Sequence, residues 1–261
     1  MIKSLHKYLW KPLPVGIRKI IHRNLPKAYK KSLKQSVIND LSDAIVISFP
    51  KCGRTWLRVL LGKLLKQHFN IKSDEVLEIH RLADKDNRVP RIYFSHDDNP
   101  HKKSPNDLNT DKSTYKNQKI IFLVRDPRDV LVSIYHHKTF RTEEFEGSIR
   151  DYFNQEVGSL ESIINFYNIW DDNKNKVQDF LIIQYESLHT KPVEEIRKIL
   201  DFLNIKKVEN TKINNAIEFA SFSNMRKIEK SGEAKNDKLT TKEGSSEKAL
   251  KTRSGKVGEY K

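Results

Sequence analysis

The residues best suited to chemistry form a short run, Pro50-Lys51-Cys52-Gly53-Arg54-Thr55, directly after the apolar segment Ala44 to Phe49. The apolar segment is typical of a buried strand, and residues 55–69 have the spacing of a helix with one broad apolar face. The first amides of a helix have no internal partners and carry the positive end of the helix dipole, so an anionic phosphate binds well there. Gly53 would let the backbone approach such a group closely, and Lys51 would add a mobile positive charge. The run therefore predicts a phosphate-binding turn.

This turn differs from the loop of the nucleoside triphosphatases. That loop has the pattern G-x-x-x-x-G-K-[ST], in which the Ser or Thr directly after the Lys holds magnesium. Here Cys52 follows Lys51, and the pattern is absent. The sequence favours a phosphate site that works without a metal. The alternative is an ordinary connection between a strand and a helix, with Lys51 at the surface.

A second cluster, Arg125-Asp126-Pro127-Arg128-Asp129, follows the apolar run KIIFLV at 119–124, and Ser133 lies eight residues after Arg125. An Arg at the carboxyl end of a strand points into the crevice where open α/β sheets bind ligands. A guanidinium fork together with a hydroxyl suits a terminal phosphate monoester. The cluster predicts a second anion site. The alternative is a turn whose Asp and Arg side chains cap the helix and pair with one another.

Strand-like and helix-like segments alternate along the chain, and this order predicts the fold. The further strands are expected at RIYFS (91–95) and FLIIQY (180–185), and the further helices at 130–138, 159–175 and 192–203. Alternation of this kind predicts a central parallel sheet with helices on both faces, which is a three-layer α/β/α domain. Residues 229–251 are rich in Lys, Glu, Ser and Gly, and we expect them to be mobile unless a ligand orders them.

The chain has 261 residues, a formal charge of +15 and one cysteine. A single cysteine excludes an intrachain disulfide and zinc sites built from several thiolates. Residues 1–39 contain ten Lys or Arg and no acid, so we separate them as a basic N-terminal extension from a domain at 40–261. Basic segments attract anions. The extension is interpreted either as a peripheral contact with an anionic membrane or a partner, or as a lead-in that packs on the domain.

The sequence also bears on location and on metals. No apolar run approaches the roughly 20 residues that span a bilayer. Basic residues interrupt the N-terminus where a signal peptide would be apolar, so we expect a cytoplasmic protein. His96 and His101 lie five apart in a proline-broken loop, and His136 and His137 are adjacent. Neither spacing predicts a metal site, and no metal cofactor is expected.

Several separate motifs together resemble the cytosolic-type sulfotransferases, which use 3′-phosphoadenosine 5′-phosphosulfate (PAPS). The resemblance runs from about Ile45 to Lys261. The motifs are SFPKCGRTW (48–56), PRIYFSH (90–96), RDPRDVLVSIYHH (125–137), QYESL (184–188), SFSNM (221–225) and RSGKVGEYK (253–261). The resemblance implies a P-loop-like sulfotransferase fold and the transfer of a sulfuryl group from PAPS to a hydroxyl or an amine.

The resemblance also implies a role for each matching position. Lys51 would stabilise the leaving phosphate, and His96 would act as the general base on the acceptor. The 5′-phosphate would be held by Cys52, Gly53, Arg54 and Thr55. The 3′-phosphate would be held by Arg125, Ser133, Arg253, Ser254 and Gly255. The adenine side of the nucleotide would be contacted by Trp56, Tyr185, Ser221, Phe222 and Met225.

Two positions depart from the family pattern. Arg54 stands where the family often has a small hydroxyl residue, so its side chain either points away from the phosphate or joins the contacts to it. Ser254 replaces a basic residue of the C-terminal motif, which would weaken the grip on the 3′-phosphate.

The acceptor is expected to be a small molecule or a carbohydrate, bound by the loops at 80–115 and 138–158 and by the C-terminal tail. Candidates for the lining of its pocket are His80, Tyr93, Phe140, Phe145 and Tyr152. No specific nucleic-acid partner is expected. Two other functions stay open: a P-loop-type nucleotide kinase, and a non-catalytic nucleotide-binding module that the basic extension recruits to anionic surfaces.

Overall fold

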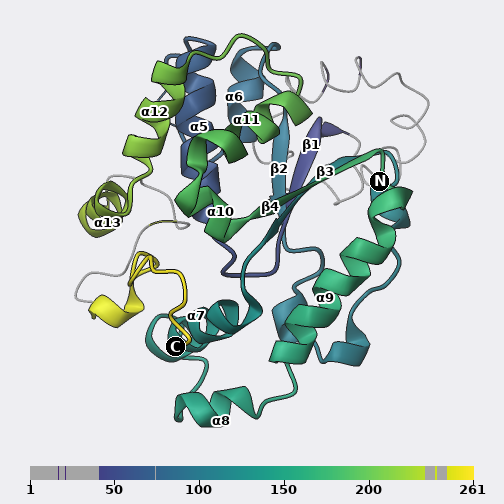
Figure 1. Ribbon diagram of the computed structural model, residues 1–261, viewed down its shortest axis with the longest axis vertical. Coiled ribbons are helices and arrows are strands. Elements are labelled where there is room, and N and C mark those ends of the chain that lie inside the picture. Colours follow the sequence, from purple (N-terminus) through teal and green to yellow (C-terminus); the bar gives the residue numbers. More distant parts are fainter. Residues whose placement is uncertain (1–16, 18–20, 22–40, 74, 233–238, 240–245) are drawn as a thin grey trace.

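The computed structural model describes residues 17, 21, 41–73, 75–232, 239 and 246–261 (Figure 1). Within this part of the chain, four strands form one parallel sheet in the order β2-β1-β3-β4. The strands are β1 (Ala44–Ile47), β2 (Ile92–Ser95), β3 (Lys119–Val124) and β4 (Asp179–Gln184). Helices lie on both sides of the sheet in Figure 1. The predicted three-layer α/β/α architecture is confirmed.

The helices lie in two groups around the sheet (Figure 1). One group contains α5 (Arg54–His68), α6 (Ile79–Lys85), α10 (Tyr185–Thr190), α11 (Pro192–Phe202), α12 (Asn210–Phe219) and α13 (Phe222–Ser231). The other contains α7 (Pro127–Phe140), α8 (Ile149–Phe153) and α9 (Leu160–Asn173). Short 3₁₀ turns are η1 (Pro100–Lys102), η2 (Pro105–Asp107), η3 (Ser113–Tyr115), η4 (Lys174–Lys176) and η5 (Glu247–Ala249). The helices α6, α8, α10, α12 and α13 were not predicted, because they are too short or too polar to show a periodic apolar pattern.

The strand order determines where a ligand can bind. From β1 the chain goes to one neighbour, β2, and then crosses back over β1 to form β3 on its other side. Ile47 at the end of β1 is in register with Ser95 of β2 and with Phe122 of β3. The strand order therefore reverses between β1 and β3, and open parallel sheets bind ligands beyond the carboxyl ends of the strands at such a point. The turn after Ile47 and the turn that begins with Arg125 both leave from this edge.

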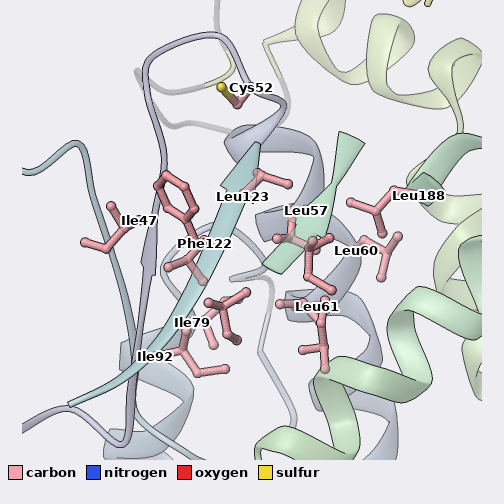
Figure 2. Packing of buried hydrophobic residues seen from close by; sticks show 14 of the residues in the cluster. Ile47, Cys52, Leu57, Leu60, Leu61, Ile79, Ile92, Phe122, Leu123 and Leu188 are labelled. Carbon is pink, nitrogen blue, oxygen red and sulfur yellow. The ribbon is translucent and has the colours of Figure 1, made fainter. Parts of the chain in front are cut away.

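Apolar packing on both faces of the sheet fixes these turns in place. Alternate residues of β3 point to opposite faces. Phe122 contacts Phe166 of α9, with ring centroids 6.0 Å apart, whereas Leu123 points toward α5 (Figure 2). On that side Leu57 and Leu60 of α5 are fully buried. Burial of each such side chain stabilises the fold by about 1.5–3 kcal/mol, so α5 and the turn that precedes it are held firmly on the sheet.

Both ends of the segment 229–251 contain helical elements. Its first residues belong to helix α13, in which Glu229 is buried. Its last residues, 246–251, include the turn η5 and contact α7. Leu239 is buried as well, and the other residues of the segment lie outside the described ones. The basic extension at 1–39 also lies outside them, apart from Ile17 and Ile21.

No helix in the described ranges combines the length and the apolar character that crossing a bilayer requires.

A buried polar network holds the chain immediately after His96. The carboxylate of Asp97 lies 2.6 Å from Nζ of Lys112, and it accepts hydrogen bonds from Trp170 Nε1 (3.1 Å) and from the Tyr115 hydroxyl (3.0 Å). Both ends of the Asp97–Lys112 pair are nearly inaccessible to solvent. Trp170 belongs to α9, so this network ties the chain that follows His96 to the group of helices that contains α7, α8 and α9.

We predict that Asp97→Ala destabilises the protein by about 3 to 5 kcal/mol, because it leaves the Lys112 ammonium buried without its counter-charge. The neighbouring Asp98 is exposed and pairs with Lys103 on the surface, so Asp98→Ala should change stability little. The free energy of unfolding in urea measures both. Equal losses in the two variants would show that the buried network does not anchor this segment.

Candidate active site

The turn between β1 and α5 has a conformation that requires glycine. Gly53 has a φ of +89°, and Lys51 has a φ of +73°. A Cβ at Gly53 would lie 2.5 Å from Cδ2 of Tyr185, so only glycine lets Tyr185 pack on the turn. No side chain caps the amino end of α5, and its first turn contains no acid. The turn therefore presents backbone amides and the positive end of the helix dipole with no local carboxylate to neutralise them.

A cavity of about 700 Å³ lies at this end of the sheet. Its volume is in the range of about 300–1,000 Å³ typical of ligand sites. Of the residues predicted for the site, those that line it are Lys51, Gly53, Arg54, Thr55, Trp56, His96, Arg125, Ser133, Tyr185, Ser221, Phe222, Met225 and Gly255. The structure thus brings residues from all six sequence motifs to one cavity.

A second pocket, of about 60 Å³, adjoins the large cavity and shares Lys51, Arg125 and Ser133 with it. This volume is about that of two water molecules in the liquid, which suits a single small anion. Most of its charged lining groups are cationic. The lining also includes His136, His137, Lys248, Lys251, Arg253, Ser254, Gly255 and Glu259. The two predicted anion sites, around Lys51 and around Arg125, therefore meet in one continuous space.

His96 is held in the tautomer that a general base needs. Its Nδ1 lies 2.9 Å from the carbonyl oxygen of Ser48. A carbonyl can only accept, so Nδ1 carries the hydrogen and donates it, and Nε2 keeps its lone pair. Burial, and after it the positive charge of Arg54, hold the pKa of His96 well below its usual value. His96 is therefore neutral at physiological pH and able to accept a proton.

Lys51 lies among other cations. Burial lowers its pKa to about 7, and Lys251 and Arg141 add to this effect, whereas the carboxylate of Glu229 opposes it. Near neutral pH the ammonium is therefore only partly charged in the absence of an anion. A negative group in the cavity would favour the charged form.

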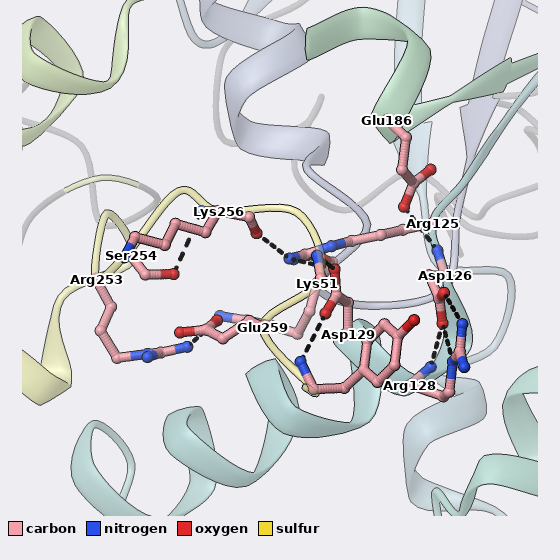
Figure 3. A network of polar contacts seen from close by, with 12 residues as sticks. Lys51, Arg125, Asp126, Arg128, Asp129, Glu186, Arg253, Ser254, Lys256 and Glu259 are labelled. Carbon is pink, nitrogen blue, oxygen red and sulfur yellow. Dashed lines mark hydrogen bonds and ion pairs between the residues drawn. The ribbon is translucent and has the colours of Figure 1, made fainter. Parts of the chain in front are cut away.

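Arg125 ties three separate segments together (Figure 3). Its Nη1 donates to the carbonyl oxygen of Lys51 at 3.3 Å, and its Nη2 donates to the carbonyl oxygen of Lys256 at 3.2 Å. The guanidinium lies 4.4 Å from the ring centroid of Tyr185 and 3.5 Å from the carboxylate of Asp129. Its Nε is buried with no hydrogen-bond partner in the described part of the chain. Arg125 therefore holds the Lys51 turn and the C-terminal segment around the cavity, and Nε is left for a further acceptor.

The C-terminal segment is held over the site by two buried carboxylates. Asp129 of α7 accepts from the backbone N–H groups of Gly258 (2.8 Å) and Tyr260 (3.1 Å). Glu229 of α13 accepts from the backbone N–H and the hydroxyl of Thr252, both at 2.9 Å. The side chain of Arg253 forms an ion pair with Glu259 beside the small pocket (Figure 3). These contacts close the cavity on the side away from the sheet.

Trp56 lies in an aromatic group on the cavity wall. Its Nε1 donates to the carbonyl oxygen of Ala220 at 2.8 Å, which joins α5 to the segment that precedes α13. Its ring centroid lies 4.6 Å from that of His189 and 5.6 Å from that of Tyr185. These rings form an apolar wall, as a purine base would require.

Comparison with known proteins decides the family. The family model described as the sulfotransferase domain matches residues 41–261. The chain belongs to the sulfotransferase domain family. The family that the motifs predicted is therefore confirmed, and so is the class of enzyme.

Two curated relatives have similar sequences. Flavonol 3-sulfotransferase from Flaveria bidentis is 28% identical over 249 residues, which cover 84% of this chain and 76% of the relative. Cytosolic sulfotransferase 5 from Arabidopsis thaliana is 26% identical over 267 residues, which cover 89% and 80% of the two chains. Among solved structures, mouse sulfotransferase SULT7A1 complexed with PAP has a TM-score of 0.56 at 22% identity, with 84% of this chain and 76% of that chain covered. At this identity the likeness shows the fold.

Cys52 is placed differently from the expectation for a sulfotransferase phosphate loop. Its side chain is fully buried, lies 3.3 Å from the hydroxyl of Tyr167, and lines neither the cavity nor the small pocket. Burial raises the pKa of the thiol to about 12. The thiol therefore does not reach the cavity wall, and the backbone amide is the part of Cys52 left to contact a phosphate. The thiol fills the turn.

The candidates for the acceptor pocket are also corrected. Phe140, Phe145, Tyr152, His80 and Tyr93 do not line the cavity. The ring centroids of His80 and Tyr93 lie 5.0 Å apart in a stack, and those of Phe145 and Tyr152 lie 5.0 Å apart edge to face. These rings pack against one another within the loops. The residues of the two loops that line the cavity, besides His96, are His101, Lys102, Lys138 and Glu144.

Lys251 was not among the predicted site residues, yet it lines both the cavity and the small pocket. Its backbone N–H donates to Glu229 at 2.8 Å, which fixes it beside Lys51. The residue lay in the range expected to be mobile. Its place two residues before Arg253, at the start of the basic C-terminal motif, is the signal that could have found it.

We predict that Asp129→Ala loosens the C-terminal segment, because the N–H groups of Gly258 and Tyr260 lose their acceptor. Hydrogen–deuterium exchange read by mass spectrometry should show faster exchange over residues 252–261. Asp171→Ala is the control: Asp171 is an exposed carboxylate of α9 that pairs with Lys174 on the surface. Unchanged exchange in the Asp129 variant would contradict the role of Asp129 in holding the C-terminal segment.

Proposed function

We propose that this protein transfers a sulfuryl group from PAPS to a hydroxyl or amine acceptor, with Lys51 and His96 as the catalytic residues. The observation that carries the proposal is that a neutral, correctly tautomerised His96, the cation Lys51 and the small cationic pocket all open into one cavity. Membership of the sulfotransferase domain family supports it. PAP, which is bound in the mouse sulfotransferase structure, is the adenosine bisphosphate that remains when PAPS has given up its sulfuryl group.

The cavity fits such a nucleotide. Arg125, Ser133, Arg253, Ser254 and Gly255 surround the small pocket, which would take the 3′-phosphate. The turn from Lys51 to Thr55 would hold the 5′ end through its amides and the ammonium group of Lys51. The aromatic wall, with Trp56, Tyr185 and Phe222, would take the base, beside Ser221 and Met225. A Cβ at Gly255 would lie 2.3 Å from the ring of Phe222, so glycine is needed where the tail meets this wall.

PAPS, when bound, supplies a sulfuryl group already activated by its bond to phosphate. Nε2 of His96 would take the proton from the acceptor as the new oxygen–sulfur or nitrogen–sulfur bond forms. Charged Lys51 would stabilise the negative charge that develops on the departing phosphate oxygen. The His96 ring is held by the Ser48 carbonyl, and the backbone of Lys51 is held by Arg125, so positioning and electrostatic stabilisation would account for the expected rate enhancement.

The acceptor is proposed to be a small molecule, as for the flavonol 3-sulfotransferase relative. The cytoplasm is the proposed compartment, in line with the name of the cytosolic relative. Family membership sets aside the nucleotide kinase. A binding module without turnover is the alternative that a sulfation assay distinguishes.

We predict that His96→Ala lowers kcat/KM by about 10²- to 10⁴-fold, because the general base is lost. Lys51→Ala should lower it by about 10²- to 10³-fold, because charge on the leaving oxygen is no longer stabilised. The measurement is mass-detected sulfation of a panel of phenols, sugars and amines with PAPS. Variants of His68 and Lys116, which lie outside the cavity, serve as controls. Wild-type turnover in both site variants would refute the assigned roles, and no turnover by the unaltered protein with intact PAP binding would support the binding module.

Binding of PAP should take up a proton. The pKa of Lys51 is lowered to about 7 in the free protein, and nearby phosphates favour its charged form. At pH 8 the free amine is mostly neutral, so binding should draw close to one proton, and affinity should fall as pH rises above 7. Lys251, with a pKa lowered to about 8, adds a smaller share. Calorimetry in two buffers of different ionisation enthalpy measures this proton uptake. An uptake that is unchanged in Lys51→Met would show that another group takes up the proton.

A further inference from the structure

Arg54 is a cation on the cavity wall without a counter-charge. It is the first residue of α5, it lines the cavity, and its side chain is mostly buried. Within the described residues no carboxylate pairs with it, and the nearest strong charge is Arg58, one turn further along the same helix. Like charges four residues apart on a helix repel each other. Burial and Arg58 together lower the pKa of Arg54 to about 9.

Arg58 cannot relieve this repulsion by moving away. It is buried, and its guanidinium lies 4.3 Å from the ring centroid of Phe94 in β2, two residues before His96. A guanidinium that is removed from water and has no anion beside it is unfavourable unless a bound ligand supplies the negative charge. The arrangement therefore points to an anionic ligand that reaches Arg54 from the cavity.

Arg54 lies outside the small pocket proposed for the 3′-phosphate of the nucleotide. Arg54 does not line the small cationic pocket, which Lys51, Arg125 and Lys251 supply. Arg54, His96, His101 and Lys102 all line the large cavity and not the small pocket. The charge of Arg54 acts on His96 and His101, whose ring centroids lie 6.4 Å apart, and also on Lys251. Arg54 therefore shares with the two histidines the part of the cavity where the acceptor would meet His96.

The other groups at this end are also mainly positive. Lys102 and Lys138 line the cavity and lie close enough to His101 to help lower its pKa to about 4, with burial as the larger cause. His101 is therefore neutral at physiological pH. Two carboxylates line the cavity in the described part of the chain: Glu144 lies beside Lys138, and Glu218 belongs to α12. Arg54, Lys102 and Lys138 outnumber the single carboxylate beside them, so the net charge around His101 is positive.

We propose that the acceptor carries a negatively charged group near the hydroxyl or amine that it presents to His96, and that Arg54 binds this group. A guanidinium fork matches a carboxylate or a sulfate or phosphate ester with two parallel hydrogen bonds. The inference rests on the proposed function and specifies its acceptor class. The competing assignment is that Arg54 holds the 5′ end of the nucleotide, as the sequence motif implied.

Matched acceptors test the inference. On a phenol scaffold, 4-hydroxyphenylacetate and 4-hydroxyphenyl sulfate are compared with neutral methyl 4-hydroxyphenylacetate; on a sugar scaffold, methyl glucuronide is compared with methyl glucoside. With PAPS and the full chain, the anionic members should have a kcat/KM about 10- to 100-fold above that of the neutral ones. Arg54→Met should abolish this preference, and Arg54→Lys should keep part of it.

PAP affinity, measured by calorimetry on the same variants, separates the two assignments. It should stay within about threefold of the unaltered protein in Arg54→Met, and a much larger loss would place Arg54 on the nucleotide and overturn the inference. Arg88→Met is the matched control, because Arg88 is an exposed Arg paired with Asp86 outside the cavity. It should leave both PAP affinity and acceptor preference unchanged.

The remaining outcomes are also decisive. If none of these acceptors turns over, saturable binding of 4-hydroxyphenylacetate to the PAP-loaded protein, observed by NMR and weakened in Arg54→Met, supports the inference, and absence of such binding overturns it. If neutral acceptors are sulfated as well as anionic ones, the inference fails while the sulfotransferase function stands. If PAP itself does not bind, the proposed function fails first.

Discussion

Positive charge gathered in one partly buried cavity is the constraint on which the rest of this structure depends. Lys51, Arg54, Arg125 and Lys251 all line the cavity. Burial and mutual repulsion disfavour the charged forms of the two lysines, so their pKa values fall to about 7 and about 8. A ligand with several negative charges relieves both effects at once. The free energy lost in assembling these cations is thus recovered on binding, and it selects ligands by charge.

The protein's own buried carboxylates hold backbone in place, which leaves much of the positive charge on the cavity wall unneutralised. Asp129 and Glu229 come from α7 and α13, a hundred positions apart in the sequence, and both accept N–H groups of the C-terminal segment. Each also lies against an Arg, Arg125 or Arg141. A carboxylate buried in this way is costly to leave unpaired, so the segment that closes the cavity is fixed by the same charges that position Arg125.

The acceptor end of the cavity shows how one charge can affect two steps. Arg54 contributes to the low pKa of His96, so the imidazole is neutral and Nε2 is free at physiological pH. Under the proposals above, the same guanidinium would attract an anionic acceptor to the place where His96 acts as base. Binding of the anion would in turn weaken the effect of Arg54 on His96 and make Nε2 more basic. Acceptor charge and base strength would then be coupled through a single residue.

The sequence by itself determined the parallel sheet and the four strand positions, and most of the site residues that it predicted line the cavity. Buried strands are short apolar runs, and the turns after them carry Lys51 and Arg125 in contiguous motifs, so local patterns suffice. It did not determine that the Cys52 side chain faces the core, that the aromatic rings of the variable loops pack on one another, or that Lys251 stands beside Lys51. It also left open which way Arg54 points. These depend on contacts between segments far apart in the chain: Cys52 meets Tyr167, and Lys251 is placed by Glu229. Only the tertiary structure decides them, because side-chain direction and burial follow from packing and charge in three dimensions, which local periodicity does not record.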